Sequence, residues 1–196
     1  KFPSHPDIAP PEGLSPQECR ELFDHAAGYE VEVHPLFQAL GHAEQILGKP
    51  KYQHLRVGPG GKGLATMTWD VRRPEAVAMI GRLVDDLCRA FPGRIFNADI
   101  TEVDYEGLLA SGSTPADVSE LVCQYVVKLR EMVRRHGMRL MVTQGPLDST
   151  GHLSGLGPKL DKLPKDILIG SYYCAGGPYR PAWKTDFPRL RDKGFA

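Results

Sequence analysis

Residues 74–104 read PEAVAMIGRLVDDLCRAFPGRIFNADITEVD and hold one complete helix–turn–strand unit followed by acidic residues. After Pro74, apolar residues recur every three or four positions, which is the pattern of an amphipathic helix. Pro92 and Gly93 end this helix, and the apolar stretch 94–100 then predicts a strand. The unit is the repeating element of an α/β protein.

The same order of helix and strand recurs on both sides of this unit. A helix capped at Ser15 precedes a predicted strand over 31–37, and a helix capped at Thr114 precedes a predicted strand over 138–143. The chain closes with a predicted strand at 167–173 and a helix at 187–193, whereas residues 48–68 read as a long loop. Strands that alternate with helices predict a parallel sheet, as found in doubly wound folds and in TIM barrels.

The composition excludes several classes of partner. Of the 196 residues, 24 are Lys or Arg and 24 are Asp or Glu, and this zero net charge argues against a nucleic-acid partner. No apolar run is long enough for a membrane span, so no membrane partner is expected. The four cysteines form no CxxC pair, and the histidines show no metal-ligand spacing. We therefore expect no cofactor and no metal site, and the sequence leaves the compartment and the oligomeric state open.

The acidic residues of the central strand are the strongest candidates for chemistry. From Ile95 to Val127 the chain carries six acidic residues and no basic one. Strand alternation puts Asn97, Asp99 and Thr101 on one face and Glu102 on the other. The carboxyl ends of parallel strands form the active-site face of α/β folds, so a catalytic carboxylate is predicted there. Gln38 and His42 follow the end of the preceding strand and are expected to reach the same face.

Several segments together resemble the family 20 glycoside hydrolases, the β-N-acetylhexosaminidases, and most of all their hexosaminidase D-like subgroup. Residues 35–42, PLFQALGH, are similar to the strand that ends in a Gly-His pair in this family. Residues 90–103, AFPGRIFNADITEV, run parallel to the family strand that carries an Asp-Glu-Val motif, which places Glu102 on the family Glu. The stretches 129–142 and 166–173 match the next two units in order.

The resemblance implies a fold and a mechanism. The family fold is a (β/α)8 TIM barrel, and residues 1–196 would form a single partial catalytic-barrel domain spanning roughly its third to sixth strands. The family mechanism is retaining and substrate-assisted, an exception to the two-carboxylate scheme. It makes Glu102 the general acid/base that protonates the leaving glycosidic oxygen, while the acetamido group of a carbohydrate substrate attacks the anomeric carbon.

The sequence departs from the family at several site positions. The family Asp that orients the acetamido group falls on Thr101, the family His falls on Asn97, and the Trp-Asp pair falls within 142–148. Asp99, one pleat deeper than Thr101, is our candidate for the missing carboxylate, which gives Glu102 and Asp99 as predicted catalytic residues. The predicted substrate-binding residues are Gln38, His42, Asn97, Thr101, Tyr172 and Tyr173. Trp69 and Trp183 are further candidates for stacking on a sugar.

Three hypotheses follow from these residues. The first is a glycosidase acting on a terminal amino sugar or a related sugar. The second is a non-catalytic carbohydrate-binding descendant of the barrel, which the replaced site residues favour. The third is an unrelated metal-dependent α/β-barrel enzyme in which Asp99, Glu102 and Asp104 hold a divalent cation.

Overall fold

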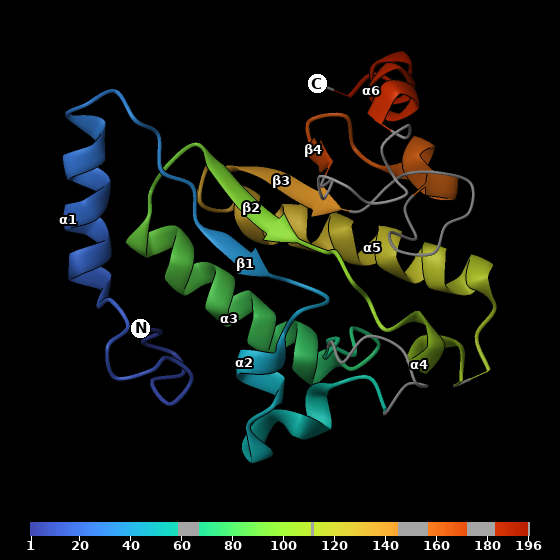
Figure 1. Cartoon of the computed structure of the whole chain (residues 1–196), viewed down its shortest axis with the longest axis horizontal. Coiled ribbons are helices and arrows are strands. Elements are labelled where there is room, and N and C mark those ends of the chain that lie inside the picture. The colour runs from blue at the N-terminus through green and yellow to red at the C-terminus, as the bar shows by residue number, and fades with distance from the viewer. Residues whose placement is uncertain (59–66, 111, 145–156, 172–182, 196) are drawn as a thin grey trace.

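Four parallel strands form a single sheet in a computed structural model of the chain (Figure 1). The structure describes residues 1–58, 67–110, 112–144, 157–171 and 183–195. The strands are β1 (Leu36–Gln38), β2 (Ile95–Asp99), β3 (Arg139–Gln144) and β4 (Leu168–Ser171), and they lie in the order β1-β2-β3-β4. Each neighbouring pair is parallel. Consecutive order in one direction is typical of a barrel segment, because a doubly wound sheet reverses direction at a switch point.

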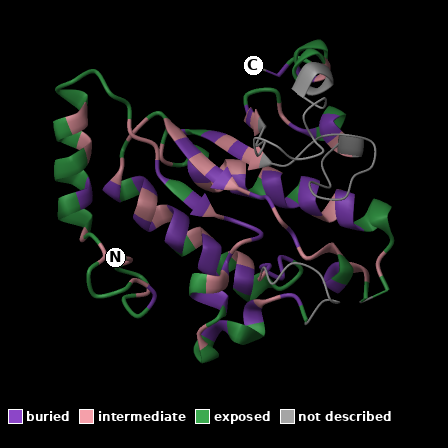
Figure 2. Ribbon diagram, in the orientation of Figure 1, coloured by how far each residue is buried: buried purple, intermediate pink, exposed green. Residues whose placement is uncertain are grey.

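Helices connect the strands and cover one side of the sheet. They are α1 (Pro16–Ala27), α2 (Glu44–Leu47), α3 (Pro74–Ala90), α4 (Tyr105–Leu109), α5 (Pro115–Arg134) and α6 (Trp183–Asp192), with 3-10 helices at Pro50–Leu55 and Gly157–Lys162. The two long helices, α3 and α5, pack against each other along the sheet (Figure 1). The helix α1 lies at the far side of α3 from α5, and only Cys19 of its residues is buried (Figures 1 and 2).

The core lies between the sheet and the long helices. Phe96 and Ala98 of β2 and Leu140 and Val142 of β3 are buried, and they alternate with less buried residues of the same strands. Figure 2 shows the same alternation along the ribbon of the sheet. The opposite face of the sheet therefore carries the alternate residues, which include Asn97 and Asp99 of β2 and Thr143 of β3.

Most predicted elements are present, with several corrections. The last helix, predicted over 187–193, is α6 (Trp183–Asp192). The first strand is shorter than the predicted 31–37. It begins at Leu36, because Pro35 before it has no N–H to donate to a strand ladder, although its carbonyl oxygen accepts from the N–H of Asn97 over 3.0 Å. The predicted loop at 48–68 contains the 3-10 helix Pro50–Leu55, whose Tyr52 and Leu55 are buried. The short helix α4 was not expected.

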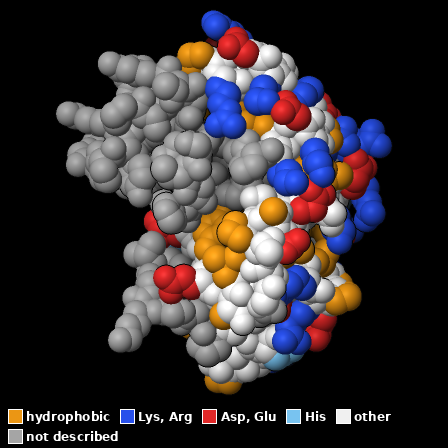
Figure 3. All heavy atoms as spheres, turned by 90° about the vertical axis from the view of Figure 1, so that its right-hand side faces the viewer, with side chains coloured by type: hydrophobic (Ala, Val, Ile, Leu, Met, Phe, Trp, Pro, Cys, Tyr) orange, Lys and Arg blue, Asp and Glu red, His pale blue; other side chains and the backbone are white. Residues whose placement is uncertain are grey.

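On the face shown in Figure 3, side chains of Lys and Arg are interspersed with those of Asp and Glu. None of the helices in the described part of the chain has the length and apolar content that a membrane span requires.

Candidate functional site

The site forms where β1 and β2 end side by side. Asp99 is the last residue of β2, and its Oδ1 accepts a hydrogen bond of 2.8 Å from the backbone N–H of Thr101. The backbone N–H of Ala39, just past β1, donates to the carbonyl oxygen of Asp99 over 2.8 Å. These bonds fix the two chain segments against each other as they leave the sheet.

Gly41 allows the two segments to approach more closely than any other residue would permit. A Cβ atom at this position would collide with the carbonyl oxygen of Thr101 and would lie 2.5 Å from that of Glu102. Both obstacles are backbone atoms, which cannot rotate away. A glycine is therefore required at position 41 for the next residue, His42, to meet Glu102.

His42 and Glu102 form a close pair at this contact. His42 Nε2 lies 2.9 Å from Glu102 Oε2, and each side chain is about one-third exposed (35% and 34%). Both residues have left-handed backbone, with φ of 53° and 51°. In the described part of the chain, Glu30 is the one other non-glycine residue with positive φ. Such strain is uncommon and clusters at functional sites.

The loop that carries His42 is held from behind by buried side chains. The hydroxyl of Tyr125 on α5 donates to the carbonyl oxygen of Ala39 over 2.6 Å. The indole N–H of Trp69 donates to the carbonyl oxygen of Gln38 over 3.2 Å. Trp69 is fully buried (0% exposed), so the prediction that it stacks on a sugar is wrong: this side chain packs against the backbone of the loop.

A row of polar residues crosses the sheet from β1 to β3, close to the strand ends that carry His42 and Glu102. Gln38, Asp99 and Thr143 are aligned across β1, β2 and β3. Thr143 Oγ1 donates to Oδ1 of Asn97 over 2.8 Å, which ties β3 to β2 on this face. The side-chain oxygen of Gln38 is buried and has no hydrogen-bond partner among the described residues.

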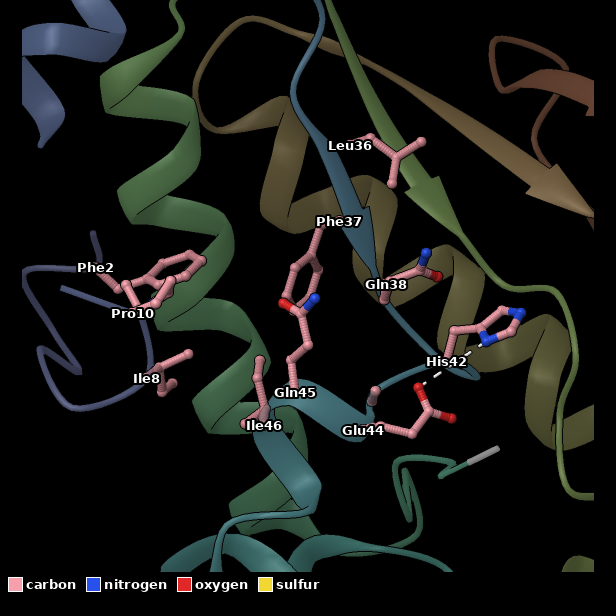
Figure 4. A pocket seen from close by; sticks show the side chains of 12 residues that line it. Phe2, Ile8, Pro10, Leu36, Phe37, Gln38, His42, Glu44, Gln45 and Ile46 are labelled. Atoms are coloured by element: carbon pink, nitrogen blue, oxygen red, sulfur yellow. Dashed lines mark ion pairs between the residues drawn. The ribbon is translucent and has the colours of Figure 1, made fainter. Parts of the chain in front are cut away.

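A pocket of about 470 Å³ with apolar and polar lining residues adjoins His42 (Figure 4). Gln38, His42 and Glu44 line one side of it, and the amino-terminal segment lines the other with residues that include Phe2, Ile8 and Pro10. The pocket lies against β1, the edge strand of the sheet.

The structure gathers most of the predicted site residues at one end of the sheet. His42 contacts Glu102, and Gln38, Asn97 and Asp99 share the polar face, whereas Thr101 is buried (6% exposed). Strand alternation does not decide which way Glu102 points. The strand β2 ends at Asp99, and Glu102 has a left-handed backbone conformation instead. Tyr172 and Tyr173 lie outside the described residues, as does the side chain of Trp183.

Glu44 is a neighbour of the pair that was not among the predicted site residues. Its Oε2 lies 4.0 Å from His42 Nδ1, as the dashed line in Figure 4 marks, whereas Glu102 approaches the other ring nitrogen, Nε2. Its place two residues after His42, at the start of α2, was the signal available in the sequence.

The three acids Asp99, Glu102 and Asp104 do not converge. Asp99 caps the N–H of Thr101, Glu102 faces His42, and Asp104 Oδ1 accepts from the N–H of Gly107 over 2.8 Å. Among the residues that the structure describes, no three His, Cys, Asp or Glu side chains are grouped to hold a metal ion.

Comparison with known proteins finds similar sequences and similar structures. No family model matches the chain. Human Hexosaminidase D is 33% identical over 79 residues, which are 40% of this chain and 15% of that protein. Bovine Hexosaminidase D is 32% identical over 94 residues, or 47% of this chain and 26% of that protein.

Solved structures share the fold over most of the chain. The chitobiase FjGH20 of Flavobacterium johnsoniae superposes with a TM-score of 0.74 at 19% identity, covering 100% of this chain and 30% of that one. Dispersin B superposes with a TM-score of 0.65 at 14% identity over 93% of this chain and 52% of that one. A GH20 exo-β-N-acetylglucosaminidase of Vibrio harveyi, solved in complex with N-acetylglucosamine, matches with a TM-score of 0.64 at 15% identity, over 92% of this chain and 27% of that one.

The chain thus spans about a quarter or less of the curated relatives it matches. Its four consecutive parallel strands correspond to part of a TIM barrel. The sequence similarity and the shared fold make this chain a relative of the GH20 β-N-acetylhexosaminidases.

Proposed function

We propose that the chain contributes the general acid of a glycoside hydrolase that removes a terminal amino sugar or a related sugar. The observation that carries this proposal is the contact of 2.9 Å between His42 and Glu102 at the carboxyl ends of β1 and β2, built on left-handed backbone in both residues. A carboxylic acid held by an imidazole in a partly exposed position is suited to proton transfer to a leaving oxygen.

Under this proposal Glu102 protonates the glycosidic oxygen and His42 orients the carboxyl group. Asp99 is the candidate for stabilising positive charge on the sugar. Its Oδ1 is fixed by the N–H of Thr101, and its side chain shares the polar face with Gln38 and Asn97. Gln38, whose buried side-chain oxygen has no hydrogen-bond partner among the described residues, is proposed as a further substrate-binding residue. We propose Asn97, Thr101, Tyr172 and Tyr173 as further substrate contacts.

The test is hydrolysis of aryl glycosides by the intact protein and by Glu102→Gln. We expect kcat to fall by about 10²- to 10⁴-fold, most steeply for substrates whose leaving group is a poor one and needs a proton. Glu106→Gln, four residues further along in α4, is the matched control and is expected to leave the rate unchanged. Equal rates for Glu102→Gln and the native protein would remove Glu102 from the mechanism.

A second candidate function is carbohydrate binding without turnover. The buried Thr101 favours it, because a threonine stands where the family carries the carboxylate that orients the acetamido group. Calorimetry with N-acetylhexosamines distinguishes the two candidates. Binding with no hydrolysis of any aryl glycoside supports the binding protein, and hydrolysis that depends on Glu102 supports the enzyme.

A further inference from the structure

A second pocket of about 470 Å³, the α3–α5 groove, lies along the seam between these two helices (Figure 1). Its walls come from residues 74–85 of α3 and residues 128–135 of α5. On α5 the lining residues are Lys128, Met132 and Arg135, whose spacing of four and three positions puts them on one face of the helix. The buried residues of α5 are others, so the groove opens away from the core.

Three exposed cationic side chains line the groove, namely Arg82 of α3 and Lys128 and Arg135 of α5. Within the part of the chain that the structure describes, none of these three side chains forms an ion pair or a hydrogen bond with another residue. Cationic side chains elsewhere on the surface do have partners. Arg130 and Lys162, for example, have carboxylate oxygens at 2.7 and 2.6 Å. The groove therefore concentrates positive charge that nearby carboxylates do not offset.

Two contacts fix how the helices are aligned along the groove. Asp85, which also lines it, has its Oδ1 2.7 Å from Nε2 of His136, so this carboxylate is already engaged by a neighbour. A Cβ atom added at Gly81 would lie 3.6 Å from the methyl carbon of Met132, so these two residues meet across the seam. Arg82 follows Gly81 and therefore lies at the level of Met132, between the two cations of α5.

The spacing of the cations indicates which ligand fits. Seven residues separate Lys128 from Arg135, which is a rise of about 10 Å along α5. Two anionic groups at this separation can each meet a cation, whereas a single phosphate group is matched to only one of them. Between the two cations the groove is lined by the uncharged side chains of Val77, Ala78 and Met132. Guanidinium and ammonium groups are the side chains that bind phosphate in proteins.

We propose that the α3–α5 groove binds an organic molecule that carries two phosphate groups, one at Lys128 and one at Arg135. The uncharged body of this ligand lies on Val77 and Met132, and Arg82 adds its charge from the opposite wall. The volume of about 470 Å³ is within the range of pockets that hold small ligands. The groove shares no described lining residue with the pocket of Figure 4, so this site does not depend on the proposed function.

The test is NMR of the intact protein labelled with ¹³C in its methionine methyl groups. The probes are 1,6-hexanediol bisphosphate, hexyl phosphate and inorganic phosphate. The Met132 signal, assigned from its loss in Met132→Leu, is expected to shift and saturate with the bisphosphate, while the signals of buried Met79 and Met138 stay in place. The bisphosphate is expected to bind at least about tenfold more tightly than either monophosphate, because its second phosphate adds a charge-assisted contact. An unchanged Met132 signal, or equal affinities for the three probes, would overturn the proposal.

Variants of the cations show whether the groove or the overall charge is responsible. Lys128→Gln and Arg135→Gln are each expected to weaken binding of the bisphosphate by about fivefold or more, towards the affinity for hexyl phosphate. The matched control is Arg134→Gln, which removes the same charge from the neighbouring position. Arg134 is not among the lining residues and has Glu131 Oε2 3.5 Å from its Nε. This variant is expected to keep the affinity within about twofold, and a loss equal to that of Arg135→Gln would overturn the proposal.

Discussion

A single hydrogen atom in the side chain of Gly41 makes the contact between His42 and Glu102 possible. Residue by residue, the site depends on backbone geometry as much as on its acidic and imidazole groups. Gly41 lets two backbones touch, and the left-handed residues on either side turn their side chains toward each other. The pair is thus the product of one close approach and two strained residues.

Gly41→Ala is expected to destabilise the protein by about 1 to 3 kcal/mol, because its Cβ would meet the carbonyl oxygens of Thr101 and Glu102. Urea unfolding measures the change. The matched control is Gly81→Ala in the middle of α3, where a Cβ meets the Met132 side chain at an ordinary 3.6 Å. That substitution is expected to stabilise the protein by about 0.5 to 1 kcal/mol. Equal effects of the two substitutions would contradict the close approach.

Tyr125→Phe tests the support behind the loop. It removes the hydroxyl that donates to the Ala39 carbonyl over 2.6 Å and leaves that buried acceptor unpaired, at a cost of about 1 to 3 kcal/mol. Tyr29→Phe, at a residue 71% exposed, is expected to change the unfolding free energy by less than about 0.5 kcal/mol. Denaturant titration of both variants against the native protein gives the comparison.

Among the elements, the two capped helices have unequal roles. A Ser15–Glu18 capping box begins α1 and a Thr114–Asp117 capping box begins α5. The helix α5 packs on α3 and β3 and buries eight residues, whereas α1 buries only Cys19. The same capping chemistry therefore stabilises a core element in one case and a peripheral one in the other.

Thr114→Ala is expected to lower the global free energy of unfolding by about 1 kcal/mol, since the loss of the cap weakens a helix of the core. Ser15→Ala removes the same kind of bond, but its effect is expected to appear as faster amide hydrogen exchange within α1. Hydrogen exchange read by mass spectrometry, with urea unfolding alongside, separates the local effect from the global one. Faster exchange throughout the sheet in Ser15→Ala would show that α1 belongs to the cooperative core.

At the scale of the whole molecule, burial keeps several weak acids protonated. Burial raises the pKa of the Cys88 thiol from 9.0 to about 12, and it raises the pKa values of the Tyr105 and Tyr125 hydroxyls as well. These side chains are neutral in the folded protein at pH values where the unfolded chain releases their protons. Folding and alkaline pH are therefore linked.

The free energy of unfolding is expected to fall as pH rises from about 9 towards 12. The unfolded thiol ionises above pH 9 while folded Cys88 keeps its proton, so the stability contributed by this group is complete below pH 9 and is lost above it. Cys88 alone accounts for about 1.4 kcal/mol per pH unit in this range. Urea unfolding at a series of pH values measures the slope. A slope that is the same in Cys88→Ala and in the native protein would contradict the assignment to Cys88.

Much of the fold could be predicted from local patterns. The capping boxes of α1 and α5, the apolar periodicity of α3 and the apolar runs of β2 and β3 all act over a few residues, and each element is present. The first strand was predicted too long because Pro35 has no N–H to donate to a strand ladder, so the regular pairing with β2 starts at Leu36. The helix α4 was missed because it is only five residues long.

Some features of the candidate site could also be predicted from local patterns, and others could not. The sequence by itself determined the alternation of helices and strands, the acidic end of β2 and the candidates Glu102 and His42, because these depend on residue order and on spacing along one element. Only the tertiary structure decided that Gly41 touches the backbone after β2, that left-handed turns bring His42 to Glu102, that Glu44 approaches the other ring nitrogen of His42, and that Trp69 is buried behind the loop. The contact of Trp69 with Gln38 joins residues 31 apart, and those of Gly41 and His42 join segments 60 residues apart. Their geometry arises from tertiary packing, which no local pattern encodes.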